Sequence, residues 1–432
     1  MIKKDKLISG ALILAIGGFL TKVIGVFYRI PLTNLLGAEG IGIYQMVFPL
    51  YCLLLTSSST GVPNGIAKLI AEGKEPNAVL KSSLKLFIPI GLIGSLFMAI
   101  FSRKISLIQG NVLAKNSYLF LAPSVLAVSV ISCFRGYFQG FTNMKPTAIS
   151  QILEQFIKLL FGLTLCYFVK GSVALKASLA TLSVTISEIF ALVFLLFLIR
   201  TKVNFKEVLM AKSNVKGFIK VVFPVMLSTV VIPLTRTIEG FFIINILNKY
   251  LANATNLYGL YSGVVESLIG VPVAILYGVA ATSIPVISSK ENDLGVRYKK
   301  AKKSIKLTFI VGVIFAVGTL LVSPIIVKVL YGKLLKSEQN IAINMLRIAS
   351  VSVIFLPLMQ TLSSVLISLG HFYVPVTTST ISSSIKIILS IILLNVKSLN
   401  IFAIILTDIV SYILACFLNL VYIISREKLS VL

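Results

Sequence analysis

Long apolar runs separated by short polar loops dominate the chain from end to end. A helix that crosses a bilayer needs ~20 mainly apolar residues, and this criterion predicts about twelve spans. We therefore expect an all-α integral membrane protein. The predicted spans cover residues 7–31, 41–67, 86–102, 117–140, 147–169, 177–199, 218–246, 257–288, 307–327, 341–369, 374–394 and 399–424.

The basic residues outside these spans are distributed unevenly between the two sides of the predicted membrane. The side that carries the N-terminus holds 23 of them, and the other side holds 10. Cytoplasmic loops of membrane proteins carry the excess of Lys and Arg. We therefore expect a multi-pass protein of the cell membrane with both termini in the cytoplasm.

Composition agrees with a membrane protein and argues against a soluble one. Of the 432 residues, 57% are hydrophobic and 12% are charged, whereas soluble domains are ~25% charged. The net charge of +26 would suit a nucleic-acid binder. However, the basic residues lie mostly in short loops between apolar runs, so no nucleic-acid partner is expected. The basic loop from Lys290 to Lys306 is instead expected to anchor the topology, and contact with anionic membrane lipids is the alternative for it.

The four cysteines lie in apolar segments and show no metal-ligand spacing. We expect them to be packing residues, and the sequence predicts no metal site. They are Cys52, Cys133, Cys166 and Cys416.

A weak internal repeat suggests two related halves. Gly42-Ile43-Tyr44 resembles Gly259-Leu260-Tyr261, and Gly61-Val62 resembles Gly278-Val279, both at a separation of 217 residues. Parallel six-helix repeats are a common transporter plan, with the cargo site at the repeat interface.

The predicted division of the chain follows from this repeat. We expect an N-terminal six-helix lobe at residues 1–200, a basic cytoplasmic linker at 201–220 and a C-terminal six-helix lobe at 221–432. The two lobes would be related by pseudo-two-fold symmetry around a central cavity.

Lys220 stands at the start of the seventh predicted span and is counted with the cytoplasmic loop before it. Seven other basic side chains lie inside the predicted spans, where each costs about 2.5–3.5 kcal/mol on the insertion scale. Such residues usually face a bundle interior or a water-filled cavity. Because Lys and Arg pair well with phosphate oxygens, a positively charged interior favours anionic cargo. The seven are Lys22, Arg29, Arg135, Lys158, Arg236, Arg347 and Lys386.

Two pairs of charged residues give the first and seventh spans their predicted roles. Lys22 and Arg29 are seven residues apart and so share one helical face; Arg29 has the alternative of reaching the membrane interface. Arg236 and Glu239 lie one turn apart in the seventh span, which mirrors the first in the two-lobe plan. We expect Arg236 to face Lys22 across the cavity, with Glu239 neutralising it or holding a coupling cation.

The remaining charges inside spans are expected to form internal contacts. Glu154 and Lys158 stand at i and i+4 in the favoured order for a helical ion pair, with a structural or coupling role. Glu188, Glu266 and Asp408 are expected to be internal hydrogen-bonded partners.

The string from Arg135 to Gln155, which begins Arg-Gly-Tyr-Phe-Gln-Gly, together with residues 10–68, resembles the stage V sporulation protein B branch of polysaccharide flippases. That branch belongs to the multidrug/oligosaccharidyl-lipid/polysaccharide (MOP) exporter superfamily. The first span is also similar to that of the lipid II flippases. The resemblance implies two six-helix lobes, a V-shaped cavity and alternating access.

The resemblance also implies roles for individual residues. A basic residue at the place of Lys22 lines a central cationic cavity in those proteins, and a charged position of their eighth span falls near Glu266. Arg135 is included among the candidate cavity residues. One departure is length, since many members have fourteen spans.

The expected function is that of an alternating-access flippase for an anionic lipid-linked saccharide of the undecaprenyl-pyrophosphate type, with the peptidoglycan precursor as one candidate. Two alternatives stay open. One is an ion-coupled multidrug exporter of the same fold, and the other is a non-transporting scaffold that binds cell-wall synthesis proteins.

The sequence favours neither an enzyme nor an ATP-driven pump. The predicted outer loops are short and hold few acids, which leaves little room for a catalytic domain. No Gly-x4-Gly-Lys-Ser/Thr loop occurs. We therefore expect no cofactor and a coupling to the membrane potential or to a gradient of Na⁺ or H⁺.

Overall fold

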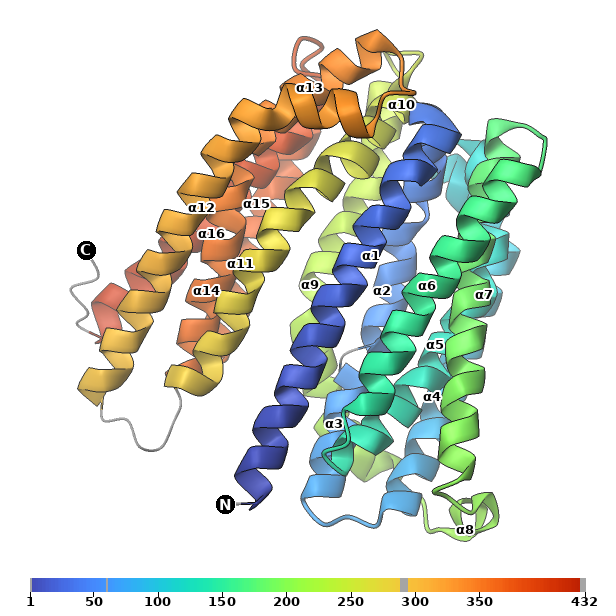
Figure 1. Cartoon of the computed structure of the whole chain (residues 1–432), viewed down its shortest axis with the longest axis vertical. Coiled ribbons are helices and arrows are strands. Elements are labelled where there is room, and N and C mark those ends of the chain that lie inside the picture. The colour runs from blue at the N-terminus through green and yellow to red at the C-terminus, as the bar shows by residue number, and fades with distance from the viewer. Residues whose placement is uncertain (1, 60, 288–293, 428–432) are drawn as a thin grey trace. The chain divides into compact units, whose positions relative to one another are not determined.

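The computed structural model describes residues 2–59, 61–287 and 294–427, and within those ranges every regular element is a helix (Figure 1). This confirms the prediction of an all-α protein. Contacts divide the chain into two compact units, Met1–Phe241 and Phe242–Leu432.

Unit 1 is built from eight helices and the larger part of a ninth. They are α1 (Ile2–Met46), α2 (Phe48–Ser59), α3 (Gly61–Ala71), α4 (Pro76–Ile108), α5 (Lys115–Gly140), α6 (Lys145–Phe168), α7 (Val173–Arg200), α8 (Phe205–Met210) and α9 (Val215–Leu247), with a short 3₁₀ turn at Val112–Ala114.

The first span ends at a break inside α1. Gly37 has φ +69°, in the left-handed region that glycine adopts without steric cost. After this break the chain returns alongside α1 as α2 and α3 (Figure 1). The apolar stretch Leu20–Ala71 is 52 residues long, which at 1.5 Å per residue greatly exceeds the ~30 Å hydrocarbon core. It therefore contains two crossings of the membrane.

The span count agrees with the sequence prediction once this stretch is divided. Ten helices of the described residues are long and apolar enough to cross a membrane, or eleven if a bent pair counts as one span. That pair, Lys336–Ala349 and Ser352–Ser368, bends by 42°. Counting the first stretch as two crossings gives the predicted twelve.

Helix α5 lies at the centre of unit 1, whereas α4 faces outward. The most apolar window of α5 is 72% buried, against 22% for α4. Small residues allow helices to approach closely in membranes, and α5 uses them on several faces. A Cβ added at Gly136 would lie 2.9 Å from the Cα of Pro63. The outward face of α4 carries Ile93 and Ile100, whose large exposed side chains suit contact with lipid tails.

Unit 2 contains the end of α9 and seven further helices. They are α10 (Ala254–Gly259), α11 (Glu266–Ile287), α12 (Leu294–Leu330), α13 (Lys336–Ala349), α14 (Ser352–Ser368), α15 (Tyr373–Leu394) and α16 (Phe402–Glu427). A six-residue π-helical segment, Leu260–Val265, joins α10 to α11.

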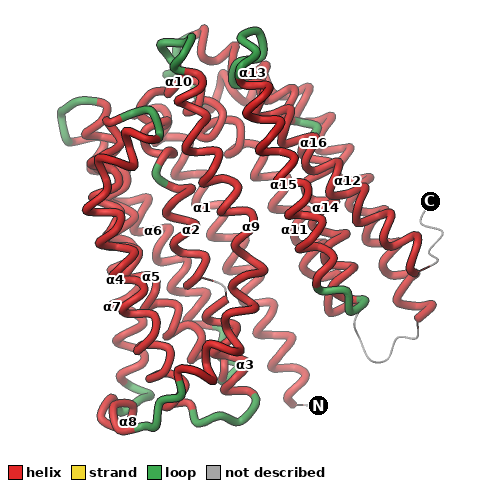
Figure 2. The backbone as a smooth tube through the Cα atoms, turned by 180° about the vertical axis from the view of Figure 1, so that it is seen from behind, coloured by secondary structure: helices red, strands yellow, loops and turns green. Residues whose placement is uncertain are grey.

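The two units repeat one packing scheme. Figure 2 shows α4, α5, α6 and α7 grouped together in unit 1, and α12, α14, α15 and α16 grouped together in unit 2. In unit 1, α4 packs on α5, α5 on α7, and α6 on α7. In unit 2, α12 packs on α14, α14 on α16, and α15 on α16. Gly42–Tyr44 lies in the segment between the first two spans of its half, and Gly259–Tyr261 occupies the same place in the other half. The structure thus supports the repeat inferred from the sequence.

The lobe boundaries predicted at residues 200 and 221 stay a prediction. Contacts group α9 up to Phe241 with unit 1, whereas the repeat counts α9 as the first helix of the second half. The two divisions can differ, because the first helix of the second repeat can still pack mainly against the first half.

Candidate functional site

Helix α9 is fastened to the start of α2 by a side chain next to Arg236. The hydroxyl of Thr237 donates a hydrogen bond to the carbonyl oxygen of Pro49 at 2.8 Å. One turn later, Gly240 leaves room for the ring of Pro49, whose Cβ would lie 3.6 Å from a Cβ added there. This close contact sets the height at which Arg236 stands beside α2.

Arg29 of α1 and Arg236 of α9 both act electrostatically on one residue of α2. Both lie within electrostatic reach of the Cys52 thiol. Cys52 is exposed, in contrast to the other three cysteines, which are buried. Arg29 is also within electrostatic reach of Tyr44 and Lys158. Two cations from distant parts of the sequence therefore lie within electrostatic reach of one exposed position of unit 1.

Lys22 and Glu239 occupy the same two helices. Lys22 is exposed on α1 and stands two turns before Arg29. Glu239, one turn after Arg236, is buried with 4% of its surface accessible. Four of the predicted cavity residues thus belong to α1 and α9, with the three cations partly or fully accessible and the acid buried.

The prediction that Glu154 pairs with Lys158 is wrong, because Glu154 has a different cationic partner. The carboxylate of Glu154 pairs with the guanidinium of Arg135, on α5. Arg135 Nε also donates to the hydroxyl of Ser150 at 3.0 Å. A guanidinium presents several donors in a fixed plane, so Arg135 can bind both α6 side chains at once. An i,i+4 lysine on the same helix cannot make this bridge between helices.

Lys158 instead lies over an aromatic ring. Its Nζ is 5.5 Å from the ring centroid of Tyr28 in α1, a distance at which cation–π attraction operates. Glu188 of α7 lies within electrostatic reach of Lys158, Glu154 and Arg135. Arg135, Glu154, Lys158 and Glu188 thus form one charged cluster, here called the unit 1 cluster.

Unit 2 contains a corresponding cluster that the sequence did not assign to a site. Lys386 Nζ of α15 is 2.8 Å from Asp408 Oδ1 of α16, and both side chains are about nine-tenths buried. Tyr261 donates to Asp408 Oδ2 at 2.5 Å, and Tyr412 donates to Oδ1 at 3.3 Å. We call these four residues the unit 2 cluster.

Glu266 stands at the edge of the unit 2 cluster. The Tyr261 hydroxyl lies 3.5 Å from Glu266 Oε1. Glu266 is partly buried and opens α11 directly after the π-helical segment. The structure therefore places Glu266 with the charged network of unit 2.

Sequence spacing could not reveal the unit 2 pair, because its members lie on separate helices. The available signal was a single lysine in one apolar span and a single aspartate in the next. Since a lone charge inside a membrane is costly, opposite charges in adjacent spans are candidates to pair.

The part of the chain that the structure describes holds no group of three His, Cys, Asp or Glu side chains arranged to bind a metal ion. The charged groups described above can attract anions or tie helices together.

Residues 7–291 match the family model of polysaccharide biosynthesis proteins, which is well over half of the chain. The chain belongs to this family.

Individual relatives of the chain agree with this family assignment. Stage V sporulation protein B of Bacillus subtilis (strain 168) is 27% identical over 349 residues, covering 76% of this chain and 67% of that protein. The lipid II flippase MurJ of the same organism is 22% identical over 335 residues, covering 70% and 61%.

Among solved structures, the inward-facing conformation of a multidrug resistance MATE family transporter of the MOP superfamily aligns with a TM-score of 0.78 at 14% identity. It covers 95% of this chain and 96% of the other. This likeness shows the fold. The chain is thus a multi-pass membrane protein of the polysaccharide biosynthesis family with the fold of a MOP superfamily transporter, and it is similar to stage V sporulation protein B and to the lipid II flippase MurJ.

Proposed function

We propose that this protein is an alternating-access flippase for an anionic lipid-linked saccharide of the undecaprenyl-pyrophosphate type. The observation that carries the proposal is that Arg29 and Arg236, from α1 and α9, both lie within electrostatic reach of the exposed Cys52. A pyrophosphate group that enters between two guanidinium groups gains charge-assisted, bidentate hydrogen bonds. Lys22, two turns along α1 from Arg29, extends this positive surface.

The family and the relatives support the same substrate class. The family model describes polysaccharide biosynthesis proteins, and one relative is named a lipid II flippase. A saccharide head with a pyrophosphate is large and polar, while its polyprenyl tail can stay in lipid during transfer. The peptidoglycan precursor is the first candidate within this class.

The charge of this surface bears on the multidrug alternative. A cationic drug would be repelled by Arg29 and Arg236, whereas an anion is attracted, so the same pair of residues separates the two substrate classes. The scaffold alternative requires no ligand at Cys52. The orientation that we propose, with both termini in the cytoplasm, follows from the bias of basic residues toward that side.

Cys52 provides a direct test, because the other three cysteines are buried. A negatively charged thiol reagent should label Cys52 several-fold faster than a positively charged one of the same size, since both arginines attract the anion. Undecaprenyl pyrophosphate should slow the labelling, and undecaprenol, which has the same tail without the phosphates, should not. A Cys52→Ser variant supplies the background.

Two results would contradict the proposal. One is equal labelling by the two reagents in wild type and in Arg236→Ala. The other is protection by a cationic drug but not by the pyrophosphate lipid, which would favour the multidrug alternative.

A further inference from the structure

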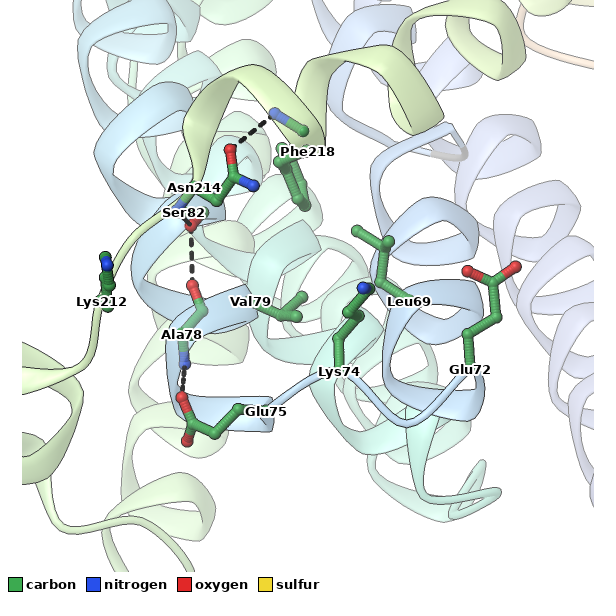
Figure 3. Close-up of a pocket in the computed structure, with 11 residues that line it drawn as sticks. Leu69, Glu72, Lys74, Glu75, Ala78, Val79, Ser82, Lys212, Asn214 and Phe218 are labelled. Carbon is green, nitrogen blue, oxygen red and sulfur yellow. Dashed lines mark hydrogen bonds between the residues drawn. The ribbon is translucent and has the colours of Figure 1, made fainter.

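A pocket of about 430 Å³ lies at one end of unit 1, and none of the charged residues described above lines it. Its walls come from the end of α3, the turn into α4, the first turns of α4, and the segment that leads from α8 into α9 (Figure 3). α8 and the turn between α3 and α4 lie at the same end of unit 1 as the start of α1 (Figure 1). By the predicted orientation, this end is cytoplasmic.

The pocket is built by contacts that hold the linker against α4. Lys81 Nζ donates to the carbonyl oxygens of Leu209 and Ala211, the second at 2.8 Å. The backbone amide of Asn214 donates to the Ser82 hydroxyl at 2.9 Å. Since these bonds need no ligand, the pocket is already formed in the structure.

The floor of the pocket is apolar. Leu69, Val79 and Phe218 line it and are buried, and all three belong to the hydrophobic core of this end of unit 1. A ligand with an apolar portion would therefore gain contact area here. A volume of about 430 Å³ is in the range of small-molecule sites.

The two acids that line the pocket are already engaged. Glu75 accepts hydrogen bonds from the amides of Asn77 and Ala78, at 3.0 and 2.6 Å, and so caps the start of α4. Glu72 pairs with Lys68 at 3.8 Å. The α4 amides and Lys68 thus offset part of the negative charge of these two acids.

The two lysines that line the pocket have no such partners. Across the described residues, the ammonium groups of Lys74 and Lys212 make no hydrogen bond or ion pair, although both residues line the cavity. Figure 3 shows Lys74 rising between Leu69 and Val79, while Lys212 stands on the linker on the other side of the pocket. Two unpaired ammonium groups beside an apolar floor suit a ligand that has both a negative charge and an apolar part.

We propose that this pocket binds the phosphate headgroup of an anionic phospholipid from the surrounding leaflet. The phosphate would lie between Lys74 and Lys212, with the glycerol and the first carbons of the chains on Leu69, Val79 and Phe218. The pocket borders the ends of membrane-spanning helices, where headgroups are abundant. A bound headgroup would join α4 to the linker that leads into α9. This inference rests on the predicted orientation and is independent of the cargo that the protein moves.

The absence of tryptophan from the chain allows a direct binding measurement. Phe218→Trp would place the only tryptophan at the floor of the pocket. In nanodiscs of phosphatidylcholine, phosphatidylglycerol with brominated acyl chains should quench its fluorescence more strongly than brominated phosphatidylcholine does. Native mass spectrometry of the wild-type protein measures the same lipid preference without any change at Phe218.

A matched pair of double variants distinguishes lipid binding in the pocket from general electrostatic attraction of anionic lipids to this end of the protein. A lysine next to a bound anionic headgroup contributes about a fivefold gain in affinity, whereas an exposed lysine farther from it is screened by solvent and salt. Lys74→Ala with Lys212→Ala should therefore weaken phosphatidylglycerol binding by roughly 25-fold. Lys206→Ala with Lys216→Ala removes the same charge from exposed positions of the same region outside the pocket, and should change binding less than about threefold.

Three results would overturn the proposal. The first is an equal loss in both double variants, and the second is equal quenching by the two brominated lipids. The third is stabilisation by inorganic phosphate or glycerol phosphate as strong as that by the lipid, with the same dependence on Lys74 and Lys212. That third result would assign the pocket to a soluble phosphate compound and exclude the lipid.

Discussion

The unit 1 cluster and the unit 2 cluster both hold buried charges, but they use them differently. In unit 2, Lys386 pairs with Asp408, and two tyrosines donate to the same carboxylate. In unit 1, Glu154 pairs with Arg135 while a second cation, Lys158, stays within electrostatic reach. In unit 2, the lysine and both tyrosines therefore contact one carboxylate, that of Asp408, whereas in unit 1 two carboxylates lie close to two cations.

Despite this difference, both clusters tie helices together. Arg135 links α5 to α6, and Lys386 links α15 to α16. Arg29 and Arg236 belong to neither cluster and lie within electrostatic reach of an exposed position. Arg135 remains a candidate cavity residue from the sequence, but its guanidinium already binds Glu154 and Ser150.

The largest effect is expected from Asp408→Ala, which leaves Lys386 nine-tenths buried without its carboxylate. Removing one partner of a buried ion pair costs about 3–5 kcal/mol. Thermal unfolding in detergent should show a large loss of stability. The double variant Lys386→Met with Asp408→Leu should recover most of it, because neither charge is then left alone. An Asp408→Ala protein as stable as wild type would show that the pair does not hold α15 to α16.

A smaller loss of stability is expected from Arg135→Ala. Glu154 loses its ion pair, but Lys158 remains close enough to attract it, so we expect about 1–3 kcal/mol, below the usual cost of breaking a buried pair. Arg135→Lys should recover only part, since an ammonium cannot reproduce the planar fork that reaches both Ser150 and Glu154. A loss as large as that of Asp408→Ala would remove the distinction between the clusters.

The sequence predicted the fold better than it predicted the contacts. Span length, loop charge and the repeated Gly-x-Tyr motif depend on local composition, and these gave the all-α class, the number of crossings and the two halves. The pairing of Glu154 was missed because the choice between Lys158 and Arg135 depends on how α5 packs on α6. The Lys386–Asp408 pair was missed for the same reason, since no local spacing joins residues of different helices.

The site was predicted in its residue types but not in its arrangement. Lys22, Arg29, Arg236 and Glu239 were singled out because a charge inside a span is costly. That Arg29 and Arg236 both lie within electrostatic reach of Cys52 could not be predicted, because it depends on how α9 packs against α2, for example through the hydrogen bond from Thr237 to Pro49. Whether these residues bind cargo stays a prediction.

The smallest effects are expected at the buried thiols of unit 1. Cys133 and Cys166 donate only weak hydrogen bonds, to the carbonyl oxygens of Ser129 and Lys176 at 3.4 and 3.3 Å. A serine hydroxyl can donate to the same acceptors, so Cys133→Ser and Cys166→Ser should each cost under about 1 kcal/mol. Transport should be retained. Loss of transport in a stable Cys133→Ser protein would reveal a thiol role at that position.

The most direct test of the cationic site is transport by Lys22→Ala and Arg236→Ala in proteoliposomes that contain an undecaprenyl-pyrophosphate-linked saccharide. Both variants should insert normally and lose nearly all transfer of the headgroup across the bilayer. Lys22→Arg should keep much of it, because it preserves a positive charge near the phosphate. Folded, inserted alanine variants that both transport as fast as wild type would contradict the account.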